Sequence, residues 1–206
     1  MVTGEQLVYF ATSSTGPFVA PEGGTEPRFG TNPIAFGFPS EGQPVIWDIG
    51  TSQMMIADTA LAKVLGRPLE PNKAFDASGH PTTDPEKALE GAFRVWGGHK
   101  GSGLALSVQL LGMLCGAQAM PDRFGGIGFF LMVLDPAILV SAETFRKEVE
   151  AYVDAIRSTR AEDPSRPVRM PFDRSRALRA KTLQDGAIEV PVEVLDALRG
   201  FVEQRA

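Results

Sequence analysis

A glycine-rich stretch, VWGGHKGSGLALSVQLLGMLCG at residues 95–116, carries His99 and Lys100 directly before a long apolar run. Glycines let backbone N–H groups approach a ligand, a helix N-terminus attracts anions, and Lys100 adds a full positive charge. These are the components of a phosphate-binding site. The stretch matches neither G-x-x-x-x-G-K-[ST] nor a G-x-G-x-x-G after a first strand. A tight turn into a core helix explains the same residues equally well.

Two carboxylates follow or interrupt apolar segments. Asp48 ends the predicted strand in VIWDIGTS, where it could bind a ligand hydroxyl or cap the next helix together with Thr51 and Ser52. Asp58 lies in the otherwise apolar MMIADTALA. A buried carboxylate at that position would need a partner, whereas a surface position on the helix would explain it simply.

The arginine, histidine and cysteine residues offer one further candidate binding site. An arginine cluster in this acidic chain could hold a phosphate, such as the 2′-phosphate of an adenosine, or could be a solvated linker. His80 is expected to be a loop residue, and no metal-ligand spacing is present, so we predict no metal site. Cys115 is expected to be an inert core thiol. The cluster consists of Arg166, Arg169, Arg174, Arg176 and Arg179.

The surrounding pattern predicts one α/β domain of strands mixed with helices and long loops. Strands are expected at 7–12, 34–38 and 45–49, with a central strand within 126–134. Helices are expected at 51–65, from Asp84 and Pro85 onward, at about 102–119, at 141–158 with Phe145, Tyr152 and Val153 on its apolar face, and at about 191–204. Residues 1–160 would form the core, and 161–206 an Arg-rich linker and a helix packing on the same domain.

The composition is that of a globular protein. The 206 residues are 43% hydrophobic and 22% charged, with a net charge of −5 that excludes a basic field for nucleic acid. No segment reaches the ~18–20 apolar residues of a membrane span, and the N-terminus lacks the features of a signal peptide. The single cysteine fits a cytoplasmic location.

Four stretches in order, RFGTNPIAFGFPS, WDIGTS, DASGHPTTDPEKAL and WGGHKGSGLALSVQLLGMLCGA, resemble the malate/L-lactate dehydrogenase type 2 family. The resemblance implies a non-Rossmann α/β fold, a mixed sheet with flanking helices, and NADPH or NADH as cofactor. It further implies a homodimer or other homo-oligomer acting on a small-molecule substrate. The residues that match cofactor-contacting positions of the family are Ser14, Thr15, Asp48, Ile49, Gly50, His99, Lys100, Arg174 and Arg176.

Asp58 resembles an aspartate of the cyclic-imine reductases, where it forms part of a charge relay with a Ser-His pair. The favoured activity is therefore reduction of Δ1-piperideine-2-carboxylate or Δ1-pyrroline-2-carboxylate by NADPH. A malate, L-lactate or ureidoglycolate type of 2-hydroxy acid dehydrogenase, reducing a 2-keto acid in the reverse direction, is the alternative within the family.

Family members are longer, by an N-terminal helical region that contains the Ser-His pair and a substrate-binding arginine. This chain begins at the strand after that region, so we expect little or no turnover by the isolated chain. The alternatives are a truncated remnant that binds NAD(P)H or associates with full-length homologues, and an α/β domain without a nucleotide role.

Overall fold

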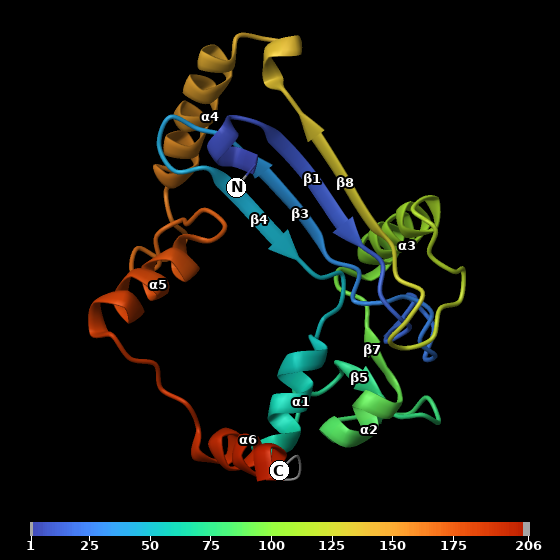
Figure 1. Cartoon of the computed structure of the whole chain (residues 1–206). Helices are drawn as coiled ribbons and strands as arrows, with labels where there is room; N and C mark the ends of the chain where they lie inside the picture. Colours follow the sequence, from blue (N-terminus) through green and yellow to red (C-terminus); the bar gives the residue numbers. More distant parts are fainter. Residues whose placement is uncertain (1, 204–206) are drawn as a thin grey trace. The chain divides into compact units, whose positions relative to one another are not determined.

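The computed structural model describes residues 2–203, and its internal contacts divide the chain into two compact units (Figure 1). Unit 1 contains the residues up to Ala11, Ile34–Ile49 and Leu131–Ile188. Unit 2 contains Thr12–Pro33, Gly50–Phe130 and the residues from Glu189 onward. Each unit is therefore built from segments that are distant in sequence, and the boundary expected at residue 160 stays a prediction.

A four-stranded sheet with the order β4-β3-β1-β8 forms the centre of unit 1. Its strands are β1 (Val8–Ser13), β3 (Ile34–Phe38), β4 (Val45–Ile49) and β8 (Phe129–Leu134), and Figure 1 shows neighbouring arrows running in opposite directions. β3 and β4 have the predicted bounds and pair antiparallel, with Phe36 opposite Trp47 and Gly37 opposite Ile46. Short 3₁₀ turns, η1 (Val2–Glu5) and η2 (Pro136–Ile138), also lie in this unit.

The expectation that the apolar run 126–134 forms a central strand is wrong. β8 stands at the edge of its sheet, and the side chains of Phe129, Leu131, Met132 and Val133 are exposed. An apolar run indicates a strand through side-chain type alone, but its place in the sheet depends on which other strands are present to pair with it.

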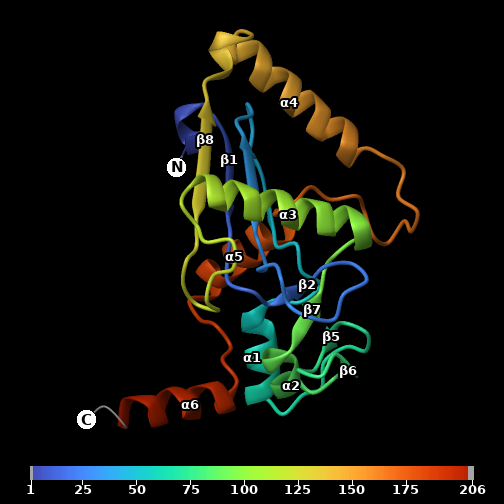
Figure 2. The same cartoon turned by 90° about the vertical axis from the view of Figure 1, so that its right-hand side faces the viewer.

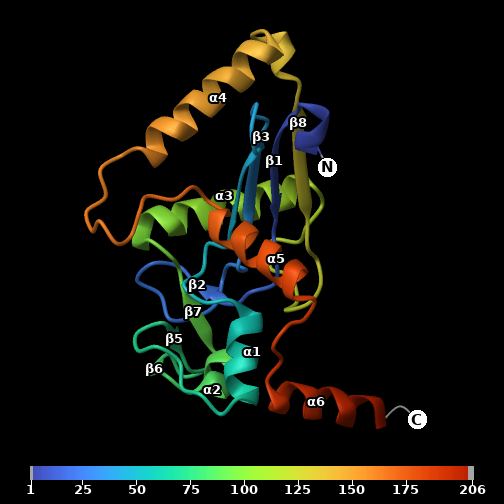
Figure 3. The ribbon, with the colours of Figure 1, turned by 90° about the vertical axis from the view of Figure 1, so that its left-hand side faces the viewer.

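Two helices of unit 1 follow the sheet. α4 (Ala142–Arg157) is capped by Ser141 and buries Val153 as predicted, although Tyr152 on the same stripe is exposed. α5 (Asp173–Asp185) begins inside the segment predicted to be a linker, residues 161–180, and occupies its C-terminal part (Figure 3). The segment is rich in Arg, Ala, Leu and Lys, which are strong helix formers, so its helical propensity exceeded the effect of the prolines before it.

Unit 2 contains a second four-stranded sheet with the order β2-β7-β5-β6 (Figure 2). β2 (Val19–Ala20) runs parallel to β7 (Ala92–Arg94), and β5 (Ala74–Phe75) runs antiparallel to β7 and to β6 (Pro81–Thr82). The mixed sheet agrees with the predicted α/β class. The main hydrophobic core lies here, formed by Phe18, Val19, Leu69, Ala74, Ala88, Phe93, Val95 and Ala105.

The two shorter helices of unit 2 differ in how well their predicted starts agree with the structure. α2 (Pro85–Glu90) starts as predicted, because Asp84 accepts hydrogen bonds from the backbone N–H groups of Glu86 and Lys87. α1 (Ile56–Val64) starts later than predicted and has Met55 at its N-cap, so the expected cap at Thr51 or Ser52 is wrong. The Thr51 hydroxyl instead donates to Thr31 O at 3.1 Å, and Ser52 accepts from Met54 N at 3.2 Å.

The long helix α3 (Gly98–Leu114) begins and ends earlier than the predicted 102–119. The residues GHKG, 98–101, therefore form the first turn of the helix rather than preceding it. Cys115, the C-cap, is exposed, which corrects the expectation of a core thiol. The last helix, α6 (Val192–Glu203), lies within the predicted range 191–204 and buries none of its residues.

Candidate functional site

Asp48 stands near the end of β4, opposite Ala35 of β3, with its side chain exposed. On the same sheet, the ring of Tyr9 lies over Gly37, where a Cβ would come within 2.0 Å of the ring atom Cε1. Only glycine leaves room for this ring. Burial, and then the negative charge of Asp48, raise the pKa of the Tyr9 phenol above its usual value. Tyr9 therefore remains a neutral hydroxyl.

A pocket of about 450 Å³ opens beside this end of β4. Trp47, Asp48 and Ile49 form one side of it, and residues 169–172, 174 and 175 form the other. Trp47 is half-buried and stacks on Phe36, with ring centroids 5.4 Å apart. The structure thus brings together Asp48, Ile49 and Arg174, three residues that the sequence selected separately.

The second side of the pocket supplies positive charge. Arg169 and Arg174 both line it with exposed side chains, and Phe172 adds an aromatic ring beside them. Arg176 lies on the same helix turn but does not line the pocket, because its guanidinium donates to Pro44 O. Arg176 is therefore a structural contact between α5 and the β3–β4 turn, and Arg174 is available to a ligand.

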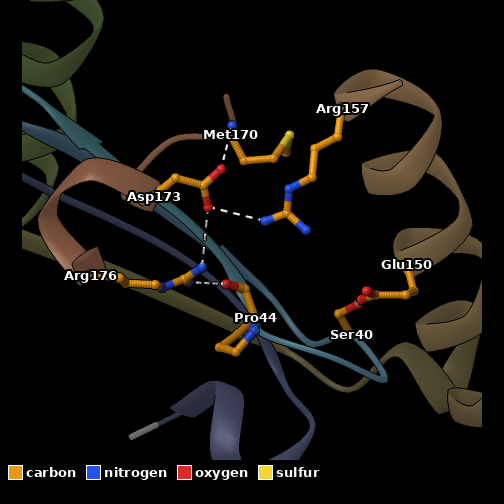
Figure 4. Close-up of polar contacts among 7 residues, drawn as sticks. All are labelled: Ser40, Pro44, Glu150, Arg157, Met170, Asp173 and Arg176. Carbon is orange, nitrogen blue, oxygen red and sulfur yellow. Dashed lines mark hydrogen bonds and ion pairs between the residues drawn. The ribbon is translucent and has the colours of Figure 1, made fainter. Parts of the chain in front are cut away.

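Asp173 holds this side of the pocket in place (Figure 4). Its carboxylate accepts from Met170 N at 2.9 Å and from Arg157 Nη2 of α4 at 3.0 Å, with Arg176 Nη1 at 4.0 Å. Burial raises the pKa of this carboxyl, but these hydrogen bonds and the charges of Arg157 and Arg176 outweigh burial, and the net pKa is lowered. Asp173 is therefore ionised near neutral pH and fixes the entry into α5.

A second carboxylate anchors the turn between β3 and β4. Glu150 of α4 lies beside Ser40 (Figure 4) and accepts a hydrogen bond from its hydroxyl. A second hydrogen bond comes from Gly42 N at 3.1 Å. The Ser40 bond is the main reason why the pKa of Glu150 is lowered. The hairpin that presents Trp47 and Asp48 is thus tied to α4.

In unit 2, the predicted phosphate-binding stretch forms the first turn of α3. Gly97 is the N-cap, with φ of +67°, and His99 and Lys100 are exposed in the first turn. A Cβ on Gly101 would lie 1.5 Å from Trp96 O, so this glycine is required for the helix to start where it does. Glu22 N donates to Ser102 Oγ at 3.3 Å, which brings a second loop to the same helix end.

The predicted contact residues Ser14 and Thr15 belong to a buried polar network. Ser14 Oγ accepts from Gly128 N at 2.9 Å, and the side chain is buried. Thr15 N donates to Asn32 Oδ1 at 3.2 Å, and Thr15 Oγ1 accepts from Thr31 N at 3.0 Å. The hydroxyls of both residues are engaged within the protein, and their role as cofactor contacts stays a prediction.

Asn32 joins this network to α3. Its side chain is completely buried, and Nδ2 donates to Ala105 O at 2.9 Å and to Gln109 Oε1 at 3.1 Å. The sequence contained a signal for Asn32, since an asparagine directly before Pro33 interrupts the approach to an apolar strand. Its partners on α3 could not be inferred from that signal.

The remaining candidates lie at the surface. Asp58 is exposed in the first turn of α1, which is the simple explanation for a carboxylate in that helix, and it lines a pocket of about 290 Å³ with Gln53 and Lys73. His80 lies in an exposed loop whose backbone is organised by Asp76. Among residues 2–203, no group of three or more His, Cys, Asp or Glu is placed to hold a metal ion.

Within the described part of the chain, no helix combines the length and the hydropathy needed to cross a bilayer.

Sequence reasoning missed the aromatic residues of the unit 1 pocket, Trp47 and Phe172, whereas Arg169 was selected within the arginine cluster as a possible phosphate contact. Asp173, the residue that positions the second side of the pocket, was also missed. The backbone of Phe172 has the αL conformation, with φ of +69°, at the point where the loop ends and α5 starts. Phenylalanine is not a residue type that predicts this conformation.

Comparisons with known proteins give a consistent family. The model of the malate/L-lactate dehydrogenase family matches residues 1–199. Delta(1)-pyrroline-2-carboxylate reductase 2 of Burkholderia multivorans is 51% identical over 112 residues, which are 54% of this chain and 33% of that protein. Delta(1)-pyrroline-2-carboxylate reductase of Pseudomonas fluorescens is 36% identical over 210 residues, covering 95% of this chain and 60% of that protein.

Similar solved structures are consistent with this family. A dehydrogenase from Sinorhizobium meliloti is 32% identical, with a TM-score of 0.88 over 97% of this chain and 60% of that one. The delta1-piperideine-2-carboxylate reductase from Pseudomonas syringae pv. tomato is 30% identical, with a TM-score of 0.77 over 95% and 60%. The chain spans about 60% of the length of these relatives. The resemblance seen in the four motifs is confirmed, and the chain belongs to the malate/L-lactate dehydrogenase family.

Proposed function

We propose that this chain is the cofactor-binding part of an NADPH-dependent reductase that acts on a cyclic imine carboxylate. The observation that carries the proposal is the unit 1 pocket, in which Asp48 and Ile49 of β4 meet Arg169 and Arg174. The names of the relatives from Burkholderia multivorans, Pseudomonas fluorescens and Pseudomonas syringae support the substrate class, Δ1-pyrroline-2-carboxylate or Δ1-piperideine-2-carboxylate.

The donor set of this pocket fits the adenosine end of a nicotinamide dinucleotide. Trp47 and Phe172 offer aromatic surface for a purine, and the Asp48 carboxylate can accept a hydrogen bond from a ribose hydroxyl. The volume of about 450 Å³ lies within the range of roughly 300–1,000 Å³ that is usual for small-molecule sites. The residues of the pocket therefore fit this part of the cofactor.

Two guanidinium groups in one pocket favour NADPH over NADH. Arginine binds phosphate with paired, charge-assisted hydrogen bonds, and a 2′-phosphate is the group that distinguishes the two cofactors. Arg169 and Arg174 are exposed at the pocket, whereas Arg176 is engaged by Pro44 O and Arg179 lines a different pocket. We assign the 2′-phosphate to Arg169 and Arg174.

Considered by itself, unit 2 offers a phosphate contact of its own, formed by Lys100 and the N–H groups at the start of α3. Lys100 is exposed, and no salt bridge to it is present in the described residues. A lysine at a helix N-terminus is repelled by the positive end of the helix dipole, and a bound anionic ligand would offset this repulsion. His99 would add a hydrogen bond to the same group.

The bound reduced nicotinamide would supply the hydride for the imine carbon. In this chain, Asp58 resembles the aspartate of the charge relay in the cyclic-imine reductases, and it would contribute to the same proton relay here. The Ser-His pair of that relay has no counterpart in the motifs of this chain, and His80 and His99 occupy other positions. The isolated chain is accordingly expected to bind cofactor but to turn over little substrate. A homodimer and a cytoplasmic location stay predictions.

The proposal is tested by titrating the full chain with NADPH and NADH and following the rise of nicotinamide fluorescence. NADPH is expected to bind more tightly than NADH. The double variant Arg169→Gln/Arg174→Gln should weaken NADPH binding at least tenfold and leave NADH binding unchanged. Arg179→Gln is the matched control, because Arg179 is an exposed arginine of α5 that does not line the pocket.

The outcomes separate the parts of the proposal. Absence of saturable binding at millimolar concentrations of either cofactor would refute the function. Equal binding of NADH and NADPH, unaffected by the double variant, would refute only the 2′-phosphate assignment. Steady NADPH oxidation by the isolated chain, with piperideine-2-carboxylate or with a 2-oxo acid, would refute the expected lack of turnover, and the faster substrate would decide between imine reductase and 2-hydroxy acid dehydrogenase.

A further inference from the structure

Phe172 has a backbone conformation that is unfavourable for its residue type. Its φ of +69° and ψ of −6° lie in the left-handed region, where the Cβ of an L-residue comes too close to the following carbonyl oxygen. Glycine avoids this contact and asparagine tolerates it, whereas a bulky side chain there is an outlier. The other non-glycine residues with positive φ among residues 2–203 are Gln6, Asn32 and Asn72, and none of these lines the unit 1 pocket.

The turn into α5 requires this backbone conformation but does not require a phenylalanine. Phe172 is the N-cap of α5, and its carbonyl oxygen accepts a hydrogen bond from Arg176 N at 2.9 Å. Next to it, Asp173 N donates to Met170 O at 3.2 Å. Both hydrogen bonds are made by main-chain atoms, so a glycine at position 172 would form the same turn without strain. The reason for a phenylalanine must therefore lie in what its side chain contacts.

Packing within the protein gives little compensation for the strain. Phe172 is 38% exposed, and it belongs to neither hydrophobic core cluster of the described residues. Such a side chain removes less apolar surface from water than a core phenylalanine does. Phe172 instead lines the pocket of about 450 Å³, with Trp47 on the other side. A strained residue that is kept at a pocket indicates a function there.

The chemistry of the pocket indicates which part of a ligand Phe172 contacts. In the proposed function, the Asp48 carboxylate binds a ribose hydroxyl, and Arg169 and Arg174 bind the 2′-phosphate. The adenine base is the remaining group of this end of the cofactor, and it is flat and aromatic. An aromatic side chain stacks on such a base, and an aliphatic side chain of similar size lacks this interaction.

We propose that Phe172 is a specificity-determining residue that stacks on the adenine base, and that the chain keeps it in a strained conformation for this contact. The proposal rests on the proposed function, because it takes the unit 1 pocket as the site of the adenosine end. It adds that stability and cofactor binding favour different residues at position 172. Glycine is the better residue for the fold, and phenylalanine is the better residue for the cofactor.

The strain is tested by comparing Phe172→Gly with Phe172→Ala in urea unfolding followed by circular dichroism. Both variants lack the ring, and only alanine has a Cβ. The unfolding midpoint of Phe172→Gly should be the higher of the two, because glycine adopts a positive φ without strain. Ala180→Gly is the matched control, since Ala180 is an exposed residue in the middle of α5. At this ordinary helical position the order should reverse, and the glycine variant should have a lower midpoint than the parent protein.

The stacking contact is tested by NADPH fluorescence titration, with adenosine 2′-monophosphate as a competitor. The competitor contains only the base, the ribose and the phosphate assigned to the unit 1 pocket. Phe172→Gly and Phe172→Ala should weaken the binding of NADPH and of the competitor by the same factor, at least about fivefold. Phe172→Tyr keeps the ring and should retain the affinity of the parent protein.

The results that would overturn this proposal differ from those that would refute the proposed function. It is overturned if Phe172→Gly unfolds at the same or a lower urea concentration than Phe172→Ala. It is also overturned if NADPH binds the two variants as tightly as it binds the parent protein, if Phe172→Tyr loses the same affinity as they do, or if the competitor does not displace NADPH or is insensitive to the variants. The proposed function stands in all these cases, and only the absence of saturable NADPH binding to the parent protein would refute it.

Discussion

Replacing Asp173 by asparagine tests whether one carboxylate holds the pocket of unit 1 together. The side chain of Asp173 is 23% exposed and accepts hydrogen bonds from Met170 N at 2.9 Å and from Arg157 Nη2 at 3.0 Å. An asparagine keeps one acceptor oxygen but presents an NH₂ group to the second donor. The loop 169–172 would then lose one of its two attachments, and Arg157 would lose its counter-charge.

The magnitude follows from the type and exposure of these bonds. Hydrogen bonds to a charged group contribute about 1.5–3 kcal/mol, and the 40% exposure of Arg157 places this pair at the lower end because water screens it. We expect Asp173→Asn to lower the free energy of unfolding by about 1–2 kcal/mol. NADPH affinity should fall as well, since Arg169 and Arg174 flank the loosened loop.

The effect should depend on pH with a defined sign. The folded-state pKa of Asp173 is lowered, so its stabilisation is complete above the unfolded-state value of about 3.9 and is lost as the pH falls through the lower folded-state pKa. The difference between the parent protein and Asp173→Asn should thus be constant near neutral pH and shrink below about pH 4.

The assay is urea unfolding followed by the fluorescence of Trp47, in a Trp96→Phe background that leaves one tryptophan. Asp196→Asn on α6 is the matched control, because Asp196 pairs with Arg199 at 3.1 Å with both side chains more than 60% exposed. This control should change stability by less than about 0.5 kcal/mol. The reasoning fails if Asp173→Asn and Asp196→Asn have the same effect, or if the effect of Asp173→Asn is unchanged at pH 3.

Three further predictions address other parts of the molecule. Lys100→Ala should weaken NADPH binding by about 1–3 kcal/mol while leaving thermal stability equal or slightly higher, because a cation is removed from the N-terminus of α3; an unchanged dissociation constant would exclude Lys100 as a contact. Gly37→Ala should destabilise the protein by about 1–3 kcal/mol, because the new methyl group meets the Tyr9 ring, whereas Gly103→Ala has free space within a helix and should be neutral or stabilising; calorimetry that ranks the two in the opposite order would contradict this packing. Cys115 should react with a thiol reagent at the rate of an exposed cysteine without denaturant, and protection until unfolding would contradict its position at the end of α3.

Local signals predicted those parts of the fold whose determinants lie close together in sequence. The bounds of β3 and β4 follow from two apolar runs joined by the turn PSEGQP, and α2 starts where Asp84 and Pro85 require it. The start of α1 was mispredicted because the hydroxyls of Thr51 and Ser52 bond to Thr31 and Met54 rather than to a helix end. Helix propensities do not take account of such competition between hydrogen-bond partners.

The candidate site was predicted in its pieces and not as an assembly. Family motifs identified Asp48, Ile49 and Arg174, and the pocket brings these three together. They gave no indication that the neighbouring Arg176 is engaged by Pro44 O or that Ser14 is buried against Gly128. Whether a polar side chain is free to bind a ligand depends on its partners in space, and those partners come from other segments of the chain.

The sequence by itself determined the family, the α/β class and the residue types available for a phosphate, because motif order and side-chain chemistry are properties of the chain. The tertiary structure alone decided which arginines line the pocket, that Asp173 bonds to Met170 N and Arg157, and that the leucines 106, 110 and 114 of α3 are exposed. These features depend on long-range packing, where contacts between distant segments set burial and charge pairing. No local pattern records which segments will meet.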